Sequence, residues 1–327
     1  MSYSIQDSNN PVAWDELVRE AGGHPLQLWG WGELKSRHRF TAERLIVRDG
    51  DTVVALAQLL TRKLPGPFPD LVYCPRGPVV CDVSTAEIAD LLLEHVKRNH
   101  KALAFSIEPD EEHFELTSKW QRAKSPILPA RTLILDLQQS DDALLGDMTK
   151  KHRQYIRKSE REPSLEIRPV TSLEQLEECL AIYEQTAERA QFGLHEHQYY
   201  VDAFEQLGDR NAIWASYEHN LPVAFLWLTH SDRTSFELYG GMSARGQALR
   251  ANYALKWHAI RAMKSRGVHR YDLGGLINDG VTTFKKGFAS HENVLAGTWD
   301  YPLSTLYTLW SGLLPTAKKV FRSIKRR

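Results

Sequence analysis

The sequence predicts an α/β protein with mixed sheets, built from two similar units in tandem. A chain of 327 residues with 42% hydrophobic and 25% charged residues is long enough to bury two domain-sized cores. Each half also repeats one order of elements: a tyrosine-bearing strand, a glycine turn, an amphipathic helix, and a second strand that brings an acidic residue. We interpret this repeat as the duplication of one α/β unit.

The first half contains one copy of this pattern. Residues 71–80 (LVYCPRGPVV) predict a strand followed by a turn. Residues 86–99 carry apolar side chains at helical spacing, which predicts an amphipathic helix. Residues 102–107 then predict a strand that leads directly into Glu108.

The second half contains the other copy. Residues 225–228 and 235–239 predict a hairpin, and the two glycines that follow turn the chain. Residues 252–265 place large apolar side chains on one face of a helix. The strand predicted over 270–273 contains Asp272.

Between the halves, the strand-like run 133–137 precedes a long charged helix that begins near Asp141. We therefore predict a first domain over 1–140 and a second over 141–302. The segment 303–327 has the pattern of a helix, and its length predicts that it packs back on the first domain.

Composition excludes several classes of protein. A formal net charge of zero argues against a protein that coats nucleic acid and allows only local basic patches. No apolar run approaches the roughly 18 residues of a membrane span and no leader is recognisable, so we expect a cytoplasmic protein. The three cysteines lack zinc-site spacing, and the thirteen histidines form no HExxH motif. We therefore expect neither a metal nor another cofactor.

Two basic segments could contact phosphates. The tail AKKVFRSIKRR suits anionic lipid headgroups or the tRNA backbone. An ordinary basic terminus would have the same sequence pattern. An ordinary solvated helix would likewise explain the segment KKHRQYIRKSER and is the commoner explanation of a charge run. Its candidate phosphate-binding residues are Lys150, Lys151, Arg153, Arg157 and Lys158.

Two further segments combine lysine with aromatic residues. In FKKGF, Phe284 and Lys285 could form a short turn that holds a cation near a reacting carbonyl, or they could belong to an ordinary surface loop. In WGWGELK, Trp29, Trp31 and Lys35 could hold a flat ring and an anionic group. Core tryptophans beside an exposed lysine would look the same.

Together these segments resemble the FemABX family, the non-ribosomal aminoacyltransferases that build peptidoglycan cross-bridges. The order of the matching strings agrees with the family over nearly the whole chain. These strings are WGWGELK, CPRGPVV, SIEPD, TAERAQF, YGGMS, ANYALKWHAIRAMKSRGVHRYDLGG, FKKGF and GTWDYPL.

The resemblance implies two tandem GNAT-like domains and a defined reaction. An amino acid would pass from aminoacyl-tRNA to the stem-peptide side-chain amine of a peptidoglycan precursor, either lipid II or UDP-MurNAc-pentapeptide. The product would be part of the interpeptide bridge of the cell wall, and no cofactor would be needed. We expect a monomer that works in the cytoplasm, with the basic tail as a peripheral contact at the inner face of the membrane.

The resemblance also implies roles for particular residues. Lys35 and Arg189 would hold the phosphates or the uridine of the precursor. Glu108 stands where the family usually has an aspartate near the acceptor, and Lys285 would steady the developing oxyanion. The positions that line the family's cleft correspond here to Tyr239 and Phe284.

Two other functions remain open at this stage. The run ARGQALRA is similar to the pyrophosphate loop of GNAT acetyltransferases but lacks the second glycine, so an acyl-CoA-dependent N-acyltransferase is the rival enzyme. A non-catalytic adaptor that binds the precursor or tRNA is the third interpretation. It would bind these ligands without transferring any group.

Overall fold

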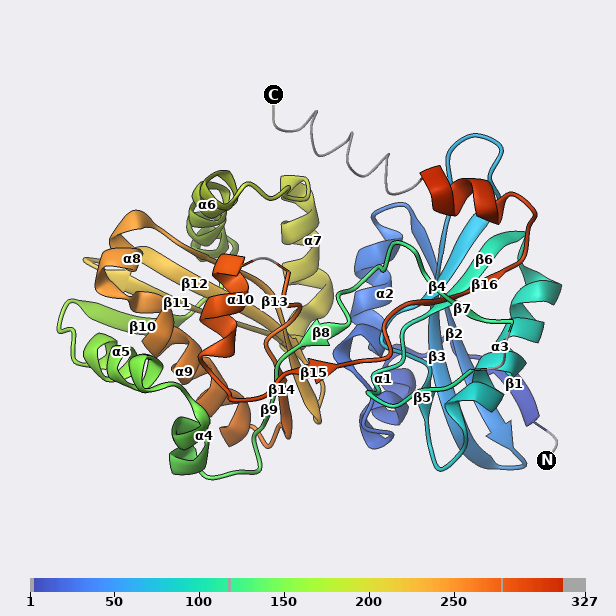
Figure 1. Cartoon of the computed structure of the whole chain (residues 1–327), viewed down its shortest axis with the longest axis horizontal. Helices are drawn as coiled ribbons and strands as arrows, with labels where there is room; N and C mark the ends of the chain where they lie inside the picture. Colours follow the sequence, from blue (N-terminus) through green and yellow to red (C-terminus); the bar gives the residue numbers. More distant parts are fainter. Residues whose placement is uncertain (1–2, 117–118, 278, 314–327) are drawn as a thin grey trace. The chain divides into compact units, whose positions relative to one another are not determined.

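The computed structural model divides the chain into two compact units (Figure 1). Unit 1 contains Met1–Ala130 and Val294–Arg327, and unit 2 contains Arg131–Asn293. None of the described helices is long and apolar enough to cross a membrane. The described residues are 3–116, 119–277 and 279–313.

The points at which the chain passes between the units differ from the predicted ones. The first lies about ten residues before position 140, because β9 (Ile134–Asp136) pairs within the sheet of unit 2. The chain returns to unit 1 at Val294 rather than at 303, because β16 (Trp299–Pro302) pairs with a strand of unit 1. Beyond it, residues 307–313 are helical, whereas 314–327, which include the whole basic tail, lie outside the described residues.

Unit 1 is built on a mixed sheet in which β4 and β6 run parallel and the other neighbours run antiparallel. A short strand, β5 (Val79–Val80), pairs with β3 beside this path. In order across the sheet, the strands are β1 (Tyr3–Asp7), β2 (Phe40–Asp49), β3 (Thr52–Arg62), β4 (Asp70–Cys74), β6 (Ala102–Ile107), β16 and β7 (Gln121–Arg122).

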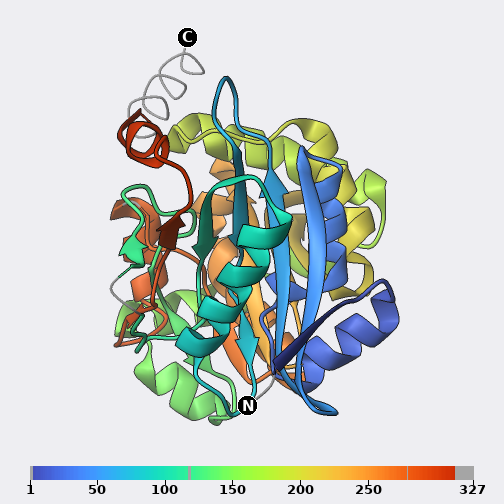
Figure 2. The same ribbon diagram turned by 90° about the vertical axis from the view of Figure 1, so that its right-hand side faces the viewer.

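Helices cover both faces of this sheet. Helix α3 (Thr85–Asn99) lies across one face (Figure 2), where its apolar stripe packs on Ala55 and Ala57 of β3. Leu56, which points the opposite way, packs against α1 (Pro11–Glu20). The same face carries η1 (Pro25–Gln27) and α2 (Trp29–Ser36).

Unit 2 repeats the arrangement. Its parallel pair is β13 with β14, and the other neighbours are antiparallel. In order across the sheet, the strands are β10 (Leu165–Pro169), β11 (Asn211–Glu218), β12 (Leu221–His230), β13 (Thr234–Met242), β14 (Arg270–Asp272) and β9. A separate two-stranded sheet consists of β8 (Arg131–Thr132) and β15 (Asn293–Val294).

The helices of unit 2 also lie on both faces of its sheet. Leu226 and Leu228 of β12 pack in the core that includes α9 (Ala251–Ser265), whereas Phe225 faces Tyr183 on α6 (Leu173–Ala190). The remaining helices are α4 (Asp141–Asp147), α5 (Lys150–Glu160), α7 (His197–Leu207), η2 (Gly208–Arg210), α8 (Ala244–Leu249) and α10 (Asp279–Lys286).

The strand orders show the duplication that the sequence predicted. In both units two helices separate the first two strands of the sheet, and one long helix precedes the last strand of the parallel pair. In both units, one further strand pairs antiparallel with the last strand of the parallel pair. This strand is β16 in unit 1 and β9 in unit 2.

The prediction of one long helix that begins near Asp141 is wrong. The chain forms two helices, because Met148 and Thr149 adopt extended conformations. Thr149 caps α5, where its hydroxyl accepts a hydrogen bond from the amide of His152.

Candidate functional site

Lys285 lies in the last turn of α10, in unit 2. The prediction that Phe284 and Lys285 occupy a short turn is therefore wrong, since both are helical. The Nζ of Lys285 donates to the carbonyl oxygen of Gly275 at 3.1 Å. Burial lowers the pKa of Lys285 to about 8, although the charge of Glu237 acts in the opposite direction.

The glycine turn after β14 makes room for this lysine. Gly274 has a φ of +72°, and a Cβ atom there would lie 3.6 Å from Lys285 Nζ and 3.2 Å from the carbonyl oxygen of Glu237. The amide of Gly274 donates to Asp272 at 2.8 Å, and the hydroxyl of Thr132 donates to the same carboxylate. The turn is thus tied to the fully buried Asp272 at the end of β14.

A buried ion pair that the sequence analysis missed adjoins this region. Lys256 on α9 lies 2.5 and 2.6 Å from the two carboxylate oxygens of Glu237 on β13, and the side chains are only 6% and 8% exposed. The hydroxyl of Tyr271 also donates to Glu237, at 2.8 Å. A lysine inside the apolar run ANYALKWHAI was the available signal, because a buried charge requires a partner.

Aromatic side chains hold α10 against α5. The ring of Phe284 packs on those of His152 and Tyr253, at centroid distances of 5.8 and 5.2 Å. His152 Nε2 lies 2.9 Å from the carbonyl oxygen of Phe284, and His152 Nδ1 lies 2.8 Å from the hydroxyl of Thr149. His152 therefore positions the turn of α10 that carries Lys285.

Gly287 provides a test of this positioning. A Cβ atom there would overlap the imidazole ring of His152. We expect Gly287→Ala to lower the free energy of unfolding by about 1–3 kcal/mol and to reduce transfer activity, as measured by urea denaturation and steady-state kinetics. Gly146→Ala is the control, because a Cβ atom at Gly146 meets nothing within 4 Å. Equal stability of both variants would contradict the packing argument.

Tyr239 on β13 belongs to a cluster of aromatic side chains. Its ring lies 5.1 Å from Tyr200, 5.3 Å from Trp227 and 5.8 Å from Tyr183. Burial and the hydrogen bond with Tyr199 raise the pKa of Tyr239 well above its ordinary value. Tyr239 therefore acts as a neutral, largely buried ring.

Arg189, near the end of α6, is exposed, and its Nη2 donates to the carbonyl oxygen of Met242 at 2.7 Å. Because Met242 ends β13, this bond places the guanidinium at the C-terminal end of that strand, three residues beyond Tyr239 and five beyond Glu237.

The five basic residues predicted to bind phosphates lie on α5, but they are not equivalent. Arg153 donates to the carbonyl oxygens of Leu145 and Gly146, both at 3.2 Å, and to that of Met148. It therefore caps α4. The exposed members of the set are Lys150, Lys151, Arg157 and Lys158.

Lys35 lies on α2, in unit 1. Its Nζ lies 4.4 Å from the ring centre of Trp31. Burial, and then the positive charge of Arg62, lower the pKa of Lys35 to about 8. The indole nitrogen of Trp31 is buried and has no hydrogen-bond partner among the residues that the structure describes. This part of α2 therefore carries a partly buried cation one helical turn from a buried indole.

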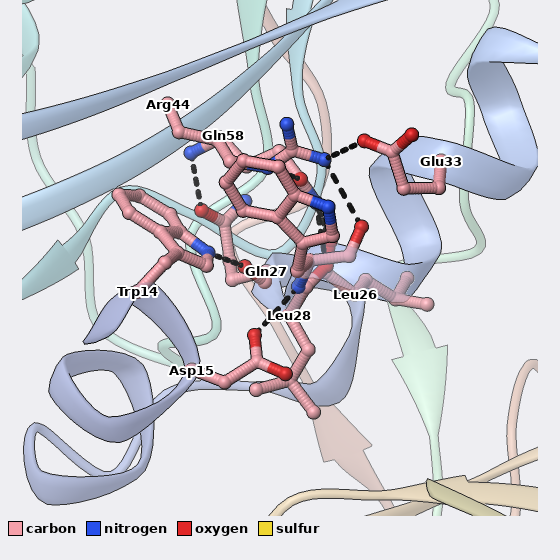
Figure 3. A network of polar contacts seen from close by, with 9 residues as sticks. Trp14, Asp15, Leu26, Gln27, Leu28, Glu33, Arg44 and Gln58 are labelled. Carbon is pink, nitrogen blue, oxygen red and sulfur yellow. Dashed lines mark hydrogen bonds and ion pairs between the residues drawn. The ribbon is translucent and has the colours of Figure 1, made fainter. Parts of the chain in front are cut away.

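A network of buried polar side chains holds the start of α2 (Figure 3). Arg44 lies over the ring of Trp29 at 3.4 Å and donates to the carbonyl oxygen of Trp29 at 3.0 Å and to Glu33 at 2.8 Å. Its Nε donates to Gln58 at 2.9 Å, and Gln58 in turn donates to two carbonyl oxygens of the preceding segment. Gly32 is needed here, because a Cβ atom would overlap Gln58 and Arg44.

Glu108 also lies in unit 1, and it is fully buried. Its Oε1 accepts from the amide of Leu128 at 2.8 Å and from the hydroxyl of Thr298, and its Oε2 accepts from the hydroxyl of Tyr73. Burial raises the pKa of Glu108, although these donors oppose the shift. Both oxygens are engaged within unit 1, so the predicted catalytic role stays a prediction.

The sequence and the fold of this chain are similar to those of known acyltransferases. The acetyltransferase (GNAT) domain model matches residues 146–286. The crystal structure of FemX aligns with a TM-score of 0.82 at 20% identity, covering 95% of this chain and 100% of FemX. A tandem GNAT protein from the clavulanic acid biosynthesis pathway aligns with a TM-score of 0.55 at 12% identity, covering 93% and 99%. The fold is that of the tandem GNAT-like acyltransferases.

Curated proteins with similar sequences indicate which kind of acyltransferase this chain resembles. Lipid II:glycine glycyltransferases of Staphylococcus aureus, from strains USA300 and Mu50, are each 25% identical over 93% of this chain and 94% of their own length. The resemblance to the FemABX family is therefore confirmed. The alignment spans 399 positions, more than the 327 residues here, so these relatives carry segments that this chain lacks.

Proposed function

We propose that this protein transfers an amino acid from aminoacyl-tRNA to the stem-peptide side-chain amine of a peptidoglycan precursor. The observation that carries the proposal is the setting of Lys285, a partly buried cation on α10 held by the turn of Gly274 and Gly275. The named activity of the lipid II:glycine glycyltransferases supports this choice of reaction.

The chemistry requires little beyond alignment and charge. The acceptor nitrogen attacks the ester carbonyl, the new C–N bond forms, and the C–O bond to the terminal ribose breaks. The amine loses a proton, and the ribose oxygen gains one. With a pKa of about 8, Lys285 is mostly protonated at neutral pH and can stabilise the tetrahedral oxyanion. Glu237 and Lys256 would act as positioning residues.

The substrates would contact different elements. The phosphates of the precursor suit Lys35, whose Nζ lies 4.4 Å from the ring centre of Trp31, and Arg189 is the second candidate cation. The tRNA backbone suits the exposed basic residues of α5, with Tyr155 beside them. The ring of Tyr155 lies 4.2 Å from the guanidinium of Arg250, which adds a further cation beside these basic residues.

The geometry of α8 disfavours acyl-CoA as the donor. GNAT enzymes bind pyrophosphate with backbone amides of an open loop, but here the same run forms a helical turn. The amide of Gly246 donates to the hydroxyl of Ser243 at 3.1 Å, and the amide of Gln247 donates to the carbonyl oxygen of Ser243 at 3.0 Å. These amides are already engaged.

The test is direct. The purified chain is incubated with mixed charged tRNAs and with UDP-MurNAc-pentapeptide or lipid II, and the mass of the acceptor is measured. We expect a gain of one aminoacyl residue that disappears when the tRNA is uncharged. Acyl gain from acyl-CoA would establish the rival donor. Binding of precursor or tRNA without transfer from either donor would establish an adaptor.

A further inference from the structure

Three metal-ligating side chains converge in unit 1 on a surface with no part in the proposed reaction. Glu43 lies on β2, His95 lies near the end of α3, and His100 directly follows that helix. His95 Nε2 lies 2.8 Å from Glu43 Oε1, and His100 Nε2 lies 2.9 Å from Glu43 Oε2. One ligand atom from each residue lies within 4.8 Å of the other two.

We propose that Glu43, His95 and His100 bind one divalent transition-metal ion of the Zn²⁺, Co²⁺ or Ni²⁺ kind. Two imidazole nitrogens and one carboxylate oxygen form a donor set that suits these ions, whereas Mg²⁺ and Ca²⁺ prefer oxygen ligands alone. Three protein ligands leave a fourth position for water.

The arrangement needs only a small change to accept such an ion. Ligand atoms about 2.0–2.2 Å from a tetrahedral metal lie about 3.3 Å apart, so no separation within the cluster needs to change by more than about 1.5 Å. The side chains are 15%, 18% and 25% exposed for His95, His100 and Glu43. An ion can therefore reach them from solvent, while the site is partly shielded from water.

Charge and hydrogen bonding also prepare the ligands. Partial burial acts to raise the pKa of Glu43, but hydrogen bonds from His100 and His95 outweigh it and hold that pKa below its ordinary value. The carboxylate is thus ionised and orients both rings. Asn99 Nδ2 lies 3.0 Å from the carbonyl oxygen of His95 and 3.2 Å from His95 Nδ1.

The hydrogen bond between His95 and Glu43 defines what the metal must displace. His95 Nε2 faces Glu43 Oε1 at 2.8 Å, so one proton lies between these two atoms. A bound ion takes the place of that proton, which leaves for solvent. The ion would then join β2 to the end of α3 and stabilise unit 1 by mass action.

The experiment uses the full chain without an affinity tag, in a Cys81→Ser background because Cys81 is a partly exposed thiol. After treatment with EDTA and its removal, the protein is titrated with Zn²⁺ by calorimetry and with Co²⁺ by visible absorption. We expect one ion per chain, a Co²⁺ ligand-field band, and a higher melting temperature with Zn²⁺. No saturable binding of either ion would overturn the proposal.

Variants assign the ligands. His95→Ala and His100→Ala should each weaken Zn²⁺ binding by at least about tenfold, because even a lost partner of a ligand costs about 10- to 100-fold. His197→Ala is the matched control, since His197 pairs with Glu177 at 2.6 Å and joins no cluster of three metal-ligating side chains among the described residues. Melting in EDTA verifies that each variant is folded. Unchanged Zn²⁺ affinity in both cluster variants would place the ion elsewhere and overturn the proposal.

Discussion

Replacing Lys285 with alanine is expected to lower kcat for aminoacyl transfer by about 10²- to 10³-fold, the usual cost of losing one stabilising donor to an oxyanion. The KM for the precursor should change less, because the carbonyl acquires its negative charge only in the transition state. Steady-state kinetics with charged tRNA and a soluble or lipid-linked precursor measure both quantities.

The neighbouring lysine provides the control. Lys286 is exposed and pairs with Glu292, so Lys286→Ala should leave kcat close to that of the unaltered protein. Normal turnover in the Lys285→Ala protein would remove Lys285 from the mechanism. Equal losses in both variants would show that any change in the last turn of α10 disturbs the site.

The pH profile separates charge from shape at the same position. Because the pKa of Lys285 is about 8, the ammonium loses its proton as the pH rises through that value, and transfer should decline there. Lys285→Arg keeps its charge at every pH of interest. If the Lys285→Arg protein retains measurable transfer activity, that activity should therefore not decline as the pH rises through 8.

Glu237→Ala is expected to lower the free energy of unfolding by about 3–5 kcal/mol, the cost of leaving one buried charge without its partner. The uncompensated group is Lys256, whose side chain is only 6% exposed. Tyr271 would also lose its acceptor. Urea denaturation followed by tryptophan fluorescence measures the change.

Two comparisons sharpen this result. The double variant Glu237→Met, Lys256→Met removes both charges, so it should lose less stability than the single variants Glu237→Met and Lys256→Met together. Glu94→Ala, which breaks the exposed pair with Lys97, should have little effect on stability. Additive losses in the double variant would mean that the two charges do not stabilise one another.

Much of the fold could be predicted because its signals are local. The predicted strand over 102–107 coincides with β6, and the predicted helices over 86–99 and 252–265 each begin one residue late. The predicted hairpin corresponds to β12 and β13, which are longer than predicted. Gly240 and Gly241 lie within β13, so the prediction that they turn the chain is wrong. Apolar spacing carries the correct part of this information without any knowledge of distant contacts.

The details of the site were harder to predict, because they depend on neighbours that are remote in the sequence. FKKGF has glycine directly after its lysines, which suggested a turn, yet packing on His152 keeps Phe284 and Lys285 helical. Arg153 belongs to a basic run, yet only the fold shows that it caps α4.

The sequence by itself determined the duplicated order of elements, the resemblance to FemABX proteins and the identity of the candidate cations. Only the tertiary structure decided which polar groups become buried partners. Glu108 meets Thr298 from 190 positions away, and Asp272 meets Thr132 from 140 positions away. The physical reason is that burial creates the need for a partner, and the partner is chosen by which strands lie side by side rather than by sequence spacing.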